Sequence, residues 1–238
     1  MRMRPVLSLL QFTTILPLGK PQDFDFFARH SWIFPVAGYV IALLVAVPVF
    51  FIADTTLAAA VAVAGVILLS GAHHFDGLLD LGDGLMAQGD EEKRTRALTD
   101  RYVGAGGIAA GLIVTLLLFA GLHAAASLIS ALIIGEVAAK FSMAFLTAYG
   151  TPFREGIHSY IHRFAKPYFP FLSLLLCIPL VLLPVSPFRL AVAAIVMILC
   201  PVALLILSER LFGGVNGDVV GAANEITRAL VIAALALA

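Results

Sequence analysis

The sequence has little charge and almost no cysteine. Asp, Glu, Lys and Arg make up 13% of its 238 residues, whereas 61% are hydrophobic and the mean hydropathy is +1.02. A soluble domain carries roughly 25% charged residues. This composition therefore excludes a soluble domain and predicts a polytopic membrane protein. The two cysteines, Cys177 and Cys200, lie inside apolar runs. They are expected to be buried packing residues, which leaves no basis for a disulfide framework or a thiolate metal site.

Apolar runs divide the chain into about seven predicted membrane spans. A helix needs about 20 apolar residues to cross a hydrocarbon core of ~30 Å. The runs cover roughly residues 32–53, 57–79, 105–122, 124–148, 168–184, 187–208 and 219–237. The short segment before them contains Gln11, Thr13 and Thr14 and lacks a small-residue cleavage site, which favours a retained interfacial helix over a signal peptide. Residues 1–238 are therefore predicted to form a single all-α, membrane-embedded catalytic domain.

Basic residues are distributed unequally between the two sides of the predicted bundle. With the amino terminus in the cytoplasm, twelve of the 15 Lys and Arg residues, from Arg2 to Arg210, fall inside and Arg189 alone falls outside. Lys140 and Arg228 lie within helices. Cytoplasmic loops of membrane proteins carry such an excess of Lys and Arg. We therefore expect a multi-pass protein of the cell (cytoplasmic) membrane, with its active site on the cytoplasmic side.

Three carboxylates and two histidines stand at the end of the second apolar run. If its helix continues, Asp76, Asp80 and Asp83 share one helical face at i, i+4 and i+7, with His73 one turn earlier. Clustered anions repel one another unless a cation joins them. Oxygen ligands suit Mg²⁺, Mn²⁺ or Ca²⁺, and the intervening glycines let a phosphate approach the backbone. The first hypothesis is therefore a metal-assisted phosphate chemistry.

A second polar segment precedes the third span. Asp100 and Arg101 stand before Gly104 and two further glycines at a predicted helix start. Backbone N–H groups and a guanidinium in this arrangement are typical of an anion site. Arg94, slightly earlier in the chain, is either a second phosphate ligand or an ordinary interfacial anchor.

The last span carries charge into an apolar setting. Asp218 stands where it begins and is either an N-cap or a member of the site. Glu225 follows seven residues later on a similar face and pairs with Arg228 at i, i+3, which favours a polar cavity over lipid. Glu136 and Lys140 are predicted to make a similar i, i+4 pair in the fourth span, and a purely structural ion pair is the alternative there.

Five segments, in this order along the chain, carry a family resemblance: LQFTTILP from Leu10, FPVAG from Phe34, HHFDGLLDLGDG from His73, DRYVG from Asp100 and GGVNGDVVGA from Gly213. Together they resemble the cobalamin synthase (adenosylcobinamide-GDP ribazoletransferase) family, nearly end to end. The resemblance implies a membrane transferase that joins adenosylcobinamide-GDP to α-ribazole or its 5′-phosphate with release of GMP. It also implies Mg²⁺ as cofactor and a place in the final assembly of adenosylcobalamin.

The implied reaction is a phosphoryl transfer in which a ribose hydroxyl attacks the phosphorus nearest cobinamide. Asp76, Asp80 and Asp83 would hold one or two Mg²⁺ ions. Asp83, Asp218 or His73 would accept the hydroxyl proton. The residues expected to bind substrate are Arg94, Asp100, Arg101, Asn216 and Glu225.

Two other classes of protein stay open. A membrane prenyltransferase also activates a pyrophosphate with Mg²⁺ at aspartate-rich helix ends, but it would normally need two such blocks and the second region here has Asp218 alone. A cation-coupled transporter would explain the charges within the spans, but it needs no aspartate cluster at a helix end. The expected partners are the two substrates and the lipid bilayer, with no nucleic acid, and an oligomer remains possible.

Overall fold

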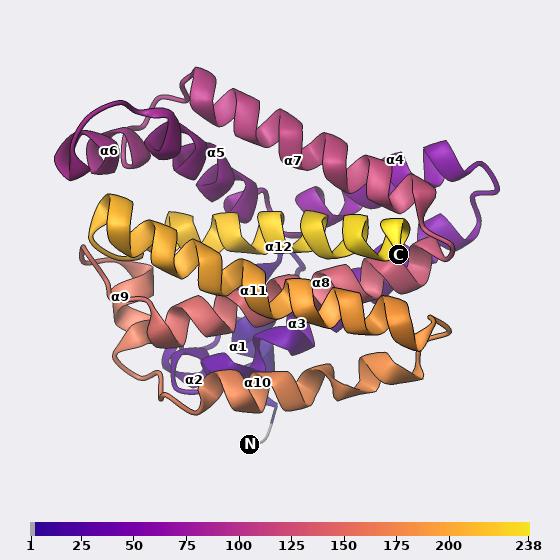
Figure 1. The fold of residues 1–238 in the computed structure, drawn as a ribbon. Coiled ribbons are helices and arrows are strands. Elements are labelled where there is room, and N and C mark those ends of the chain that lie inside the picture. The colour runs from indigo at the N-terminus through magenta and orange to yellow at the C-terminus, as the bar shows by residue number, and fades with distance from the viewer. Residues whose placement is uncertain (1–2) are drawn as a thin grey trace.

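The computed structural model describes residues 3–238, which form a bundle of helices (Figure 1). The helices are α1 (Arg4–Thr13), α2 (Asp25–Ala28), η1 (Ser31–Ile33), α3 (Phe34–Phe50), α4 (Thr55–Leu69), α5 (His73–Met86), α6 (Glu91–Leu98), α7 (Ala105–Ala124), α8 (Leu128–Tyr149), α9 (Ile157–His162), α10 (Phe169–Cys177), η2 (Ile178–Leu182), α11 (Pro187–Phe212) and α12 (Gly217–Leu237). Within this range the one extended pairing is an isolated parallel bridge between Pro152 and Val215. The predicted all-α class is confirmed.

Five helical segments of the described residues are long and apolar enough to cross a membrane: η1 with α3, α7, α8, α11 and α12. α4 and α5 meet the criterion only as a pair, and counting that pair as one span raises the number of candidate spans to six. The membrane-embedded architecture is confirmed, whereas the predicted count of seven is not. The remaining apolar run forms α10 and η2, and it is short because the helix tightens to 3₁₀ form at Ile178, before Pro179, which has no N–H for a helical bond.

The predicted span 57–79 is two helices. α4 ends at Leu69 and α5 begins at His73, with the axis turned by 93°. Between them Gly71 and Ala72 have positive φ angles of 64° and 58°, a left-handed conformation that ends an α-helix. A Cβ at residue 71 would also lie 2.7 Å from the side chain of Ile15, so this turn requires glycine. The assumption that one helix continues into the aspartates is wrong, because a new helix carries them.

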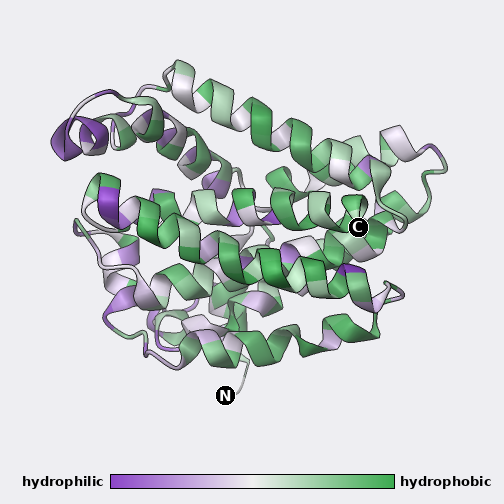
Figure 2. Ribbon diagram, in the orientation of Figure 1, coloured by the Kyte–Doolittle hydropathy of each residue, from purple (hydrophilic) through white to green (hydrophobic). Residues whose placement is uncertain are grey.

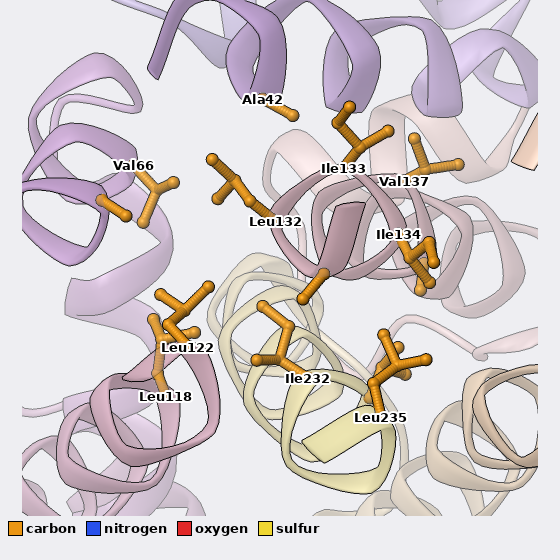
Figure 3. Packing of buried hydrophobic residues seen from close by; sticks show 14 of the residues in the cluster. Ala42, Val66, Leu118, Leu122, Leu132, Ile133, Ile134, Val137, Ile232 and Leu235 are labelled. Atoms are coloured by element: carbon orange, nitrogen blue, oxygen red, sulfur yellow. The ribbon is translucent and has the colours of Figure 1, made fainter. Parts of the chain in front are cut away.

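α8 and α12 lie inside the bundle and contact each other, and the other long helices pack around them (Figure 1). Every residue of α8 from Ser130 to Ala144 is buried. Leu132 on α8 and Ile232 on α12 belong to the same hydrophobic cluster, together with Leu122 on α7 and Val66 on α4 (Figure 3). The charged side chains of α8 and α12 are therefore surrounded by protein.

The polar connections gather mainly at one end of the bundle, around α6 and α9 (Figure 2). The ends of α5, α8 and α11 and the start of α12 meet there. The expected amino-terminal helix is present as α1, which packs against α2 and α3. Arg2, counted above among the inside charges, lies outside the described residues. The predicted site residues are thus brought to the polar end, apart from those deep within α8 and α12.

Candidate active site

α5 carries the aspartate stripe of the site. Its Leu78 and Leu81 are buried in the hydrophobic core, which turns Asp76, Asp80 and Asp83 towards the polar end. Asp76 is exposed and the other two carboxylates are partly buried. Asp80 lies within electrostatic reach of Asp76, Asp83 and also Asp218. The structure therefore adds a fourth carboxylate, from α12, to the predicted stripe.

The first turn of α12 packs directly on α5. A Cβ at Gly77 would lie 2.5 Å from the backbone oxygen of Asp218, so only glycine allows this approach. Asn216 is the N-cap of α12, because its Oδ1 accepts from the Val219 N–H at 3.0 Å. Its Nδ2 donates to Asp218 Oδ2 at 2.6 Å. The N-cap alternative for Asp218 is wrong, and Asp218 is free to belong to the site.

The carboxylate of Asp83, on α5, binds the backbone N–H groups at the start of α7. Its Oδ2 accepts from the Gly104 N–H at 2.7 Å, and its Oδ1 accepts from the Gly107 N–H at 2.8 Å. The first N–H groups of a helix have no partner within the helix and favour a negative charge. The sequence predicted an anion site for substrate here, but a carboxylate of the chain itself occupies these N–H groups. Asp83 thereby fixes α5 against α7.

Asp83→Asn is expected to lower the melting temperature of the protein. An amide offers one acceptor oxygen and points an NH₂ group at the second backbone donor, and a partly buried donor without a partner costs about 1–3 kcal/mol. Thermal unfolding in detergent measures the effect. Asp80→Asn is the matched control and should melt as the wild type does. Equal melting temperatures for both variants would contradict the structural role of Asp83.

Three further predicted substrate-binding residues lie in α6 and directly after it. Arg94 donates to the backbone oxygens of Leu85 at 3.0 Å and Gly89 at 3.3 Å, so it satisfies carbonyls at the carboxyl-terminal end of α5. Asp100 accepts from the Tyr102 N–H at 3.1 Å. Arg101 is exposed. Substrate binding by Arg94, Asp100 and Arg101 stays a prediction.

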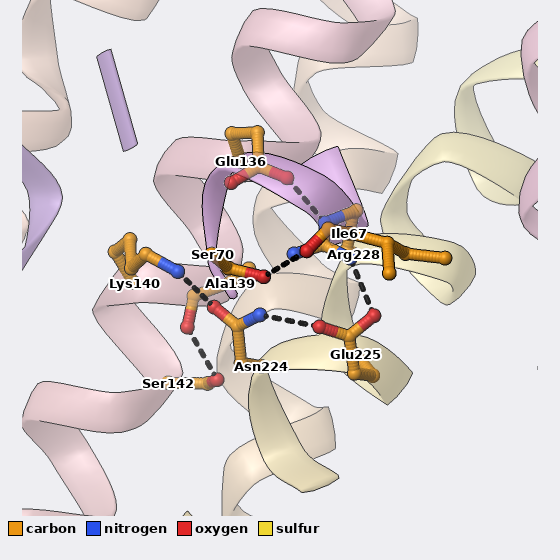
Figure 4. A network of polar contacts seen from close by, with 9 residues as sticks. All are labelled: Ile67, Ser70, Glu136, Ala139, Lys140, Ser142, Asn224, Glu225 and Arg228. Atoms are coloured by element: carbon orange, nitrogen blue, oxygen red, sulfur yellow. Dashed lines mark hydrogen bonds and ion pairs between the residues drawn. The ribbon is translucent and has the colours of Figure 1, made fainter. Parts of the chain in front are cut away.

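A charge network lies between α8 and α12 (Figure 4). Arg228 forms ion pairs with Glu136 and, at 2.5 Å, with Glu225. Lys140 Nζ donates to Asn224 Oδ1 at 2.6 Å, and Asn224 Nδ2 donates to Glu225 Oε1 at 3.0 Å. The predicted Glu225 and Arg228 pair is present. The predicted Glu136 and Lys140 pair is wrong, because both side chains bind partners on α12 across the helix interface.

A cavity of about 400 Å³ opens beside the aspartates. Asp76 and His73 of α5 and Asp218 of α12 lie on its lining. Asp80, Asp83 and Glu225 do not, and Glu225 is held in the charge network instead. The structure thus brings His73, Asp76 and Asp218 together at one cavity.

Sequence reasoning missed three residues of this region. Arg154 forms an ion pair with Asp218, with Nη2 and Oδ2 3.2 Å apart. His158 and Thr147 line the cavity. Arg154 stands in a polar link without a recognisable spacing. The i, i+4 arrangement of His158 and His162 was the one signal that sequence offered there.

Comparison with known proteins identifies the family. A family model for cobalamin-5-phosphate synthase matches residues 5–236. The chain belongs to this family. It is 37% identical to an adenosylcobinamide-GDP ribazoletransferase of Methanocella arvoryzae, over 93% of this chain and 91% of the relative.

A relative with the same name from Archaeoglobus fulgidus is 33% identical over 99% of this chain and 98% of the relative. Another from Halorubrum lacusprofundi is 34% identical over 92% of this chain and 91% of the relative. No solved structure matches the chain. The prediction of a membrane transferase of this family is confirmed.

The side chains present fit a magnesium ion shared with substrate. Among residues 3–238, no three His, Cys, Asp or Glu side chains converge as a closed metal cage. Mg²⁺ is usually bound by one or two carboxylates and completes its octahedral shell with water and substrate phosphates. Asp76 and Asp80 offer two carboxylates one turn apart, and within the described chain neither has a hydrogen-bond or ion-pair partner. This donor set suits the ion, whereas both oxygens of Asp83 already accept backbone N–H groups.

Proposed function

We propose that this chain joins adenosylcobinamide-GDP to α-ribazole or its 5′-phosphate and releases GMP. The names of its relatives support this activity. The observation within the molecule that carries the proposal is the cavity at the polar end, where Asp76, His73 and Asp218 meet beside Asp80. Such a group of carboxylates around a cavity suits a reaction that must neutralise a pyrophosphate and position a nucleophile.

The proposed step is a displacement at phosphorus. A ribose hydroxyl of the acceptor forms a bond to the phosphorus nearest cobinamide, the bond from that phosphorus to the bridging oxygen breaks, and GMP leaves with the electron pair. The hydroxyl proton passes to Asp218 or His73, because both line the cavity. Asp83 is the less suitable base, since its two oxygens bind Gly104 and Gly107.

The carboxylates have separate tasks in this proposal. Asp76 and Asp80 would hold Mg²⁺, which when bound would neutralise the pyrophosphate and stabilise the departing oxygen. Arg154 and Asn216 both donate to Oδ2 of Asp218, which fixes the orientation of that side chain. Asp83 keeps α5 against the start of α7, so that the aspartates keep their orientation.

A turnover assay in detergent tests the proposal. GMP release should require both adenosylcobinamide-GDP and an α-ribazole acceptor, and it should stop when a chelator removes Mg²⁺. The same preparation offered a prenyl diphosphate and an acceptor tests the prenyltransferase alternative, and ion flux into proteoliposomes tests the transporter. Diphosphate release from the prenyl substrate, or ion flux without any GMP release, would contradict the proposed function.

We further propose that the site faces the cytoplasm, because the polar end carries most of the basic residues. Single cysteines replacing Asp90 and Glu155 should react with an impermeant maleimide only from the cytoplasmic face. A cysteine replacing Ala53, in the turn between α3 and α4, should react only from the opposite face. The native Cys177 and Cys200 are buried and should stay unlabelled. Labelling of positions 53 and 90 from the same face would overturn this topology.

A further inference from the structure

The cavity beside the aspartates has a polar rim and an apolar floor. His73 and Asp76 are exposed and Asp218 is partly buried, so these three lining residues form part of the rim. The apolar part is lined by side chains from helices far apart in the sequence: Phe12, Phe34, Met143, Ile161 and Val220. Small-molecule sites are typically roughly 300–1,000 Å³, mostly apolar and provided with a few polar groups. This cavity, at about 400 Å³, has the dimensions and lining of such a site.

His158 lines this cavity and carries a buried hydrogen-bond acceptor without a partner in the described part of the protein. The side chain is buried, and its Nε2 lies 3.0 Å from the backbone oxygen of Gly150. A carbonyl oxygen can only accept, so Nε2 carries the proton. Burial lowers the pKa of His158 to about 4, which keeps the ring neutral and Nδ1 unprotonated. Nδ1 has no hydrogen-bond partner in the protein.

We infer that this cavity binds the acceptor nucleoside, with its benzimidazole-type base on the apolar floor, its ribose at the rim and a ribose hydroxyl donating to His158 Nδ1. The inference rests on the proposed function and names the substrate that occupies this part of the site. It explains why a buried acceptor stands without a partner, since a ribose hydroxyl supplies the missing donor. It also places the ribose next to Asp218 and Asp76, where the reacting hydroxyl is needed.

The other substrate fits this cavity poorly. A corrin ring with its adenosyl group is larger than the cavity. The guanine of GDP carries several donors and acceptors around its edge, and those that face the apolar side chains of the cavity would lack partners, which costs about 1–3 kcal/mol for each buried group. A benzimidazole has few polar atoms, so its burial on the same surface leaves few hydrogen-bonding groups without partners.

A pair of matched variants tests the inference. Met143 lines this cavity, and Met197 lines a separate apolar cavity between α8, α10 and α11; both methionines are buried. Met143→Phe should raise the KM for α-ribazole by about tenfold, which corresponds to ~1.4 kcal/mol, and should leave the KM for adenosylcobinamide-GDP unchanged. Met197→Phe should leave both constants unchanged. Binding of α-ribazole alone, followed by calorimetry in detergent, should weaken in Met143→Phe and not in Met197→Phe.

A second variant keeps the inference testable if Met143→Phe folds poorly. His158→Leu removes Nδ1 without adding volume and should raise the acceptor KM by about two- to tenfold, as the loss of one hydrogen bond does. It also removes the Nε2 bond to Gly150, so its melting temperature is measured beside the KM. Wild-type protein without GMP release would reject the proposed function itself. Wild-type turnover with an unchanged acceptor KM in both variants would overturn the inference alone. A raised KM for adenosylcobinamide-GDP in place of the acceptor would also overturn it, because the cavity would then hold the donor.

Discussion

Asp76→Asn and Asp80→Asn are each expected to lower turnover by about 100-fold or more while the protein remains folded, since removing one preorganised charged group at a reacting centre costs about that much. Both carboxylates lie at the polar end and lack partners in the described chain. Their removal therefore breaks no contact that holds the bundle together. Initial rates of GMP release at saturating substrate and Mg²⁺, together with melting temperatures, measure the two effects.

The same chemical change elsewhere provides the control for this result. Glu92 lies on α6 and makes an exposed ion pair with Arg96, at 2.9 Å, so Glu92→Gln should keep wild-type turnover. Asp218→Asn should lose activity without loss of stability, because Asn216 remains as the cap of α12. Near wild-type turnover for both Asp76→Asn and Asp80→Asn would contradict their proposed role in holding Mg²⁺.

Arg228→Met is expected to destabilise the protein by about 3–5 kcal/mol, the usual effect of removing one partner from a buried ion pair. Arg228 is 1% exposed and compensates two carboxylates, Glu136 on the neighbouring helix and Glu225 on its own. Methionine fills much of the same volume, so the loss arises from uncompensated charge. Unfolding in detergent with increasing denaturant measures the change in free energy.

Two comparisons separate charge from packing in this result. Arg210→Met at an exposed position of α11 should leave the free energy of unfolding unchanged. The double variant Arg228→Met, Glu225→Gln should recover part of the lost stability, because it removes one carboxylate together with its cation and leaves Glu136 and Lys140 as opposite charges. A single Arg228→Met variant as stable as the wild type would show that the network contributes nothing to the fold.

The charge network also bears on the geometry of the site. It joins the buried helix α8 to α12, and the first turn of α12 carries Asn216 and Asp218 onto α5. A change at Arg228 therefore reaches Asp218 through about three turns of rigid helix. The buried charges, which first suggested a polar cavity or a transport pathway, have partners within the protein, so no transport function is needed to explain them.

The sequence by itself determined the class of the protein, the approximate position of the apolar helices and the shared face of Asp76, Asp80 and Asp83. Hydrophobic length and helical spacing are local properties, and each can be read from a short stretch of chain. The motifs that follow one another along the chain were also sufficient to indicate the family, which the match over residues 5–236 confirms.

Only the tertiary structure decided which polar groups meet. The break before α5 depends on a left-handed Ala72, a conformation that alanine adopts only when its surroundings impose it. The partners of Asp83 and Glu136 lie on other helices, more than 20 residues away in the chain. The cavity lined by His158 likewise exists because α1, α8, α9 and α12 converge. Such contacts depend on how whole helices pack, and local sequence spacing contains no information about that packing.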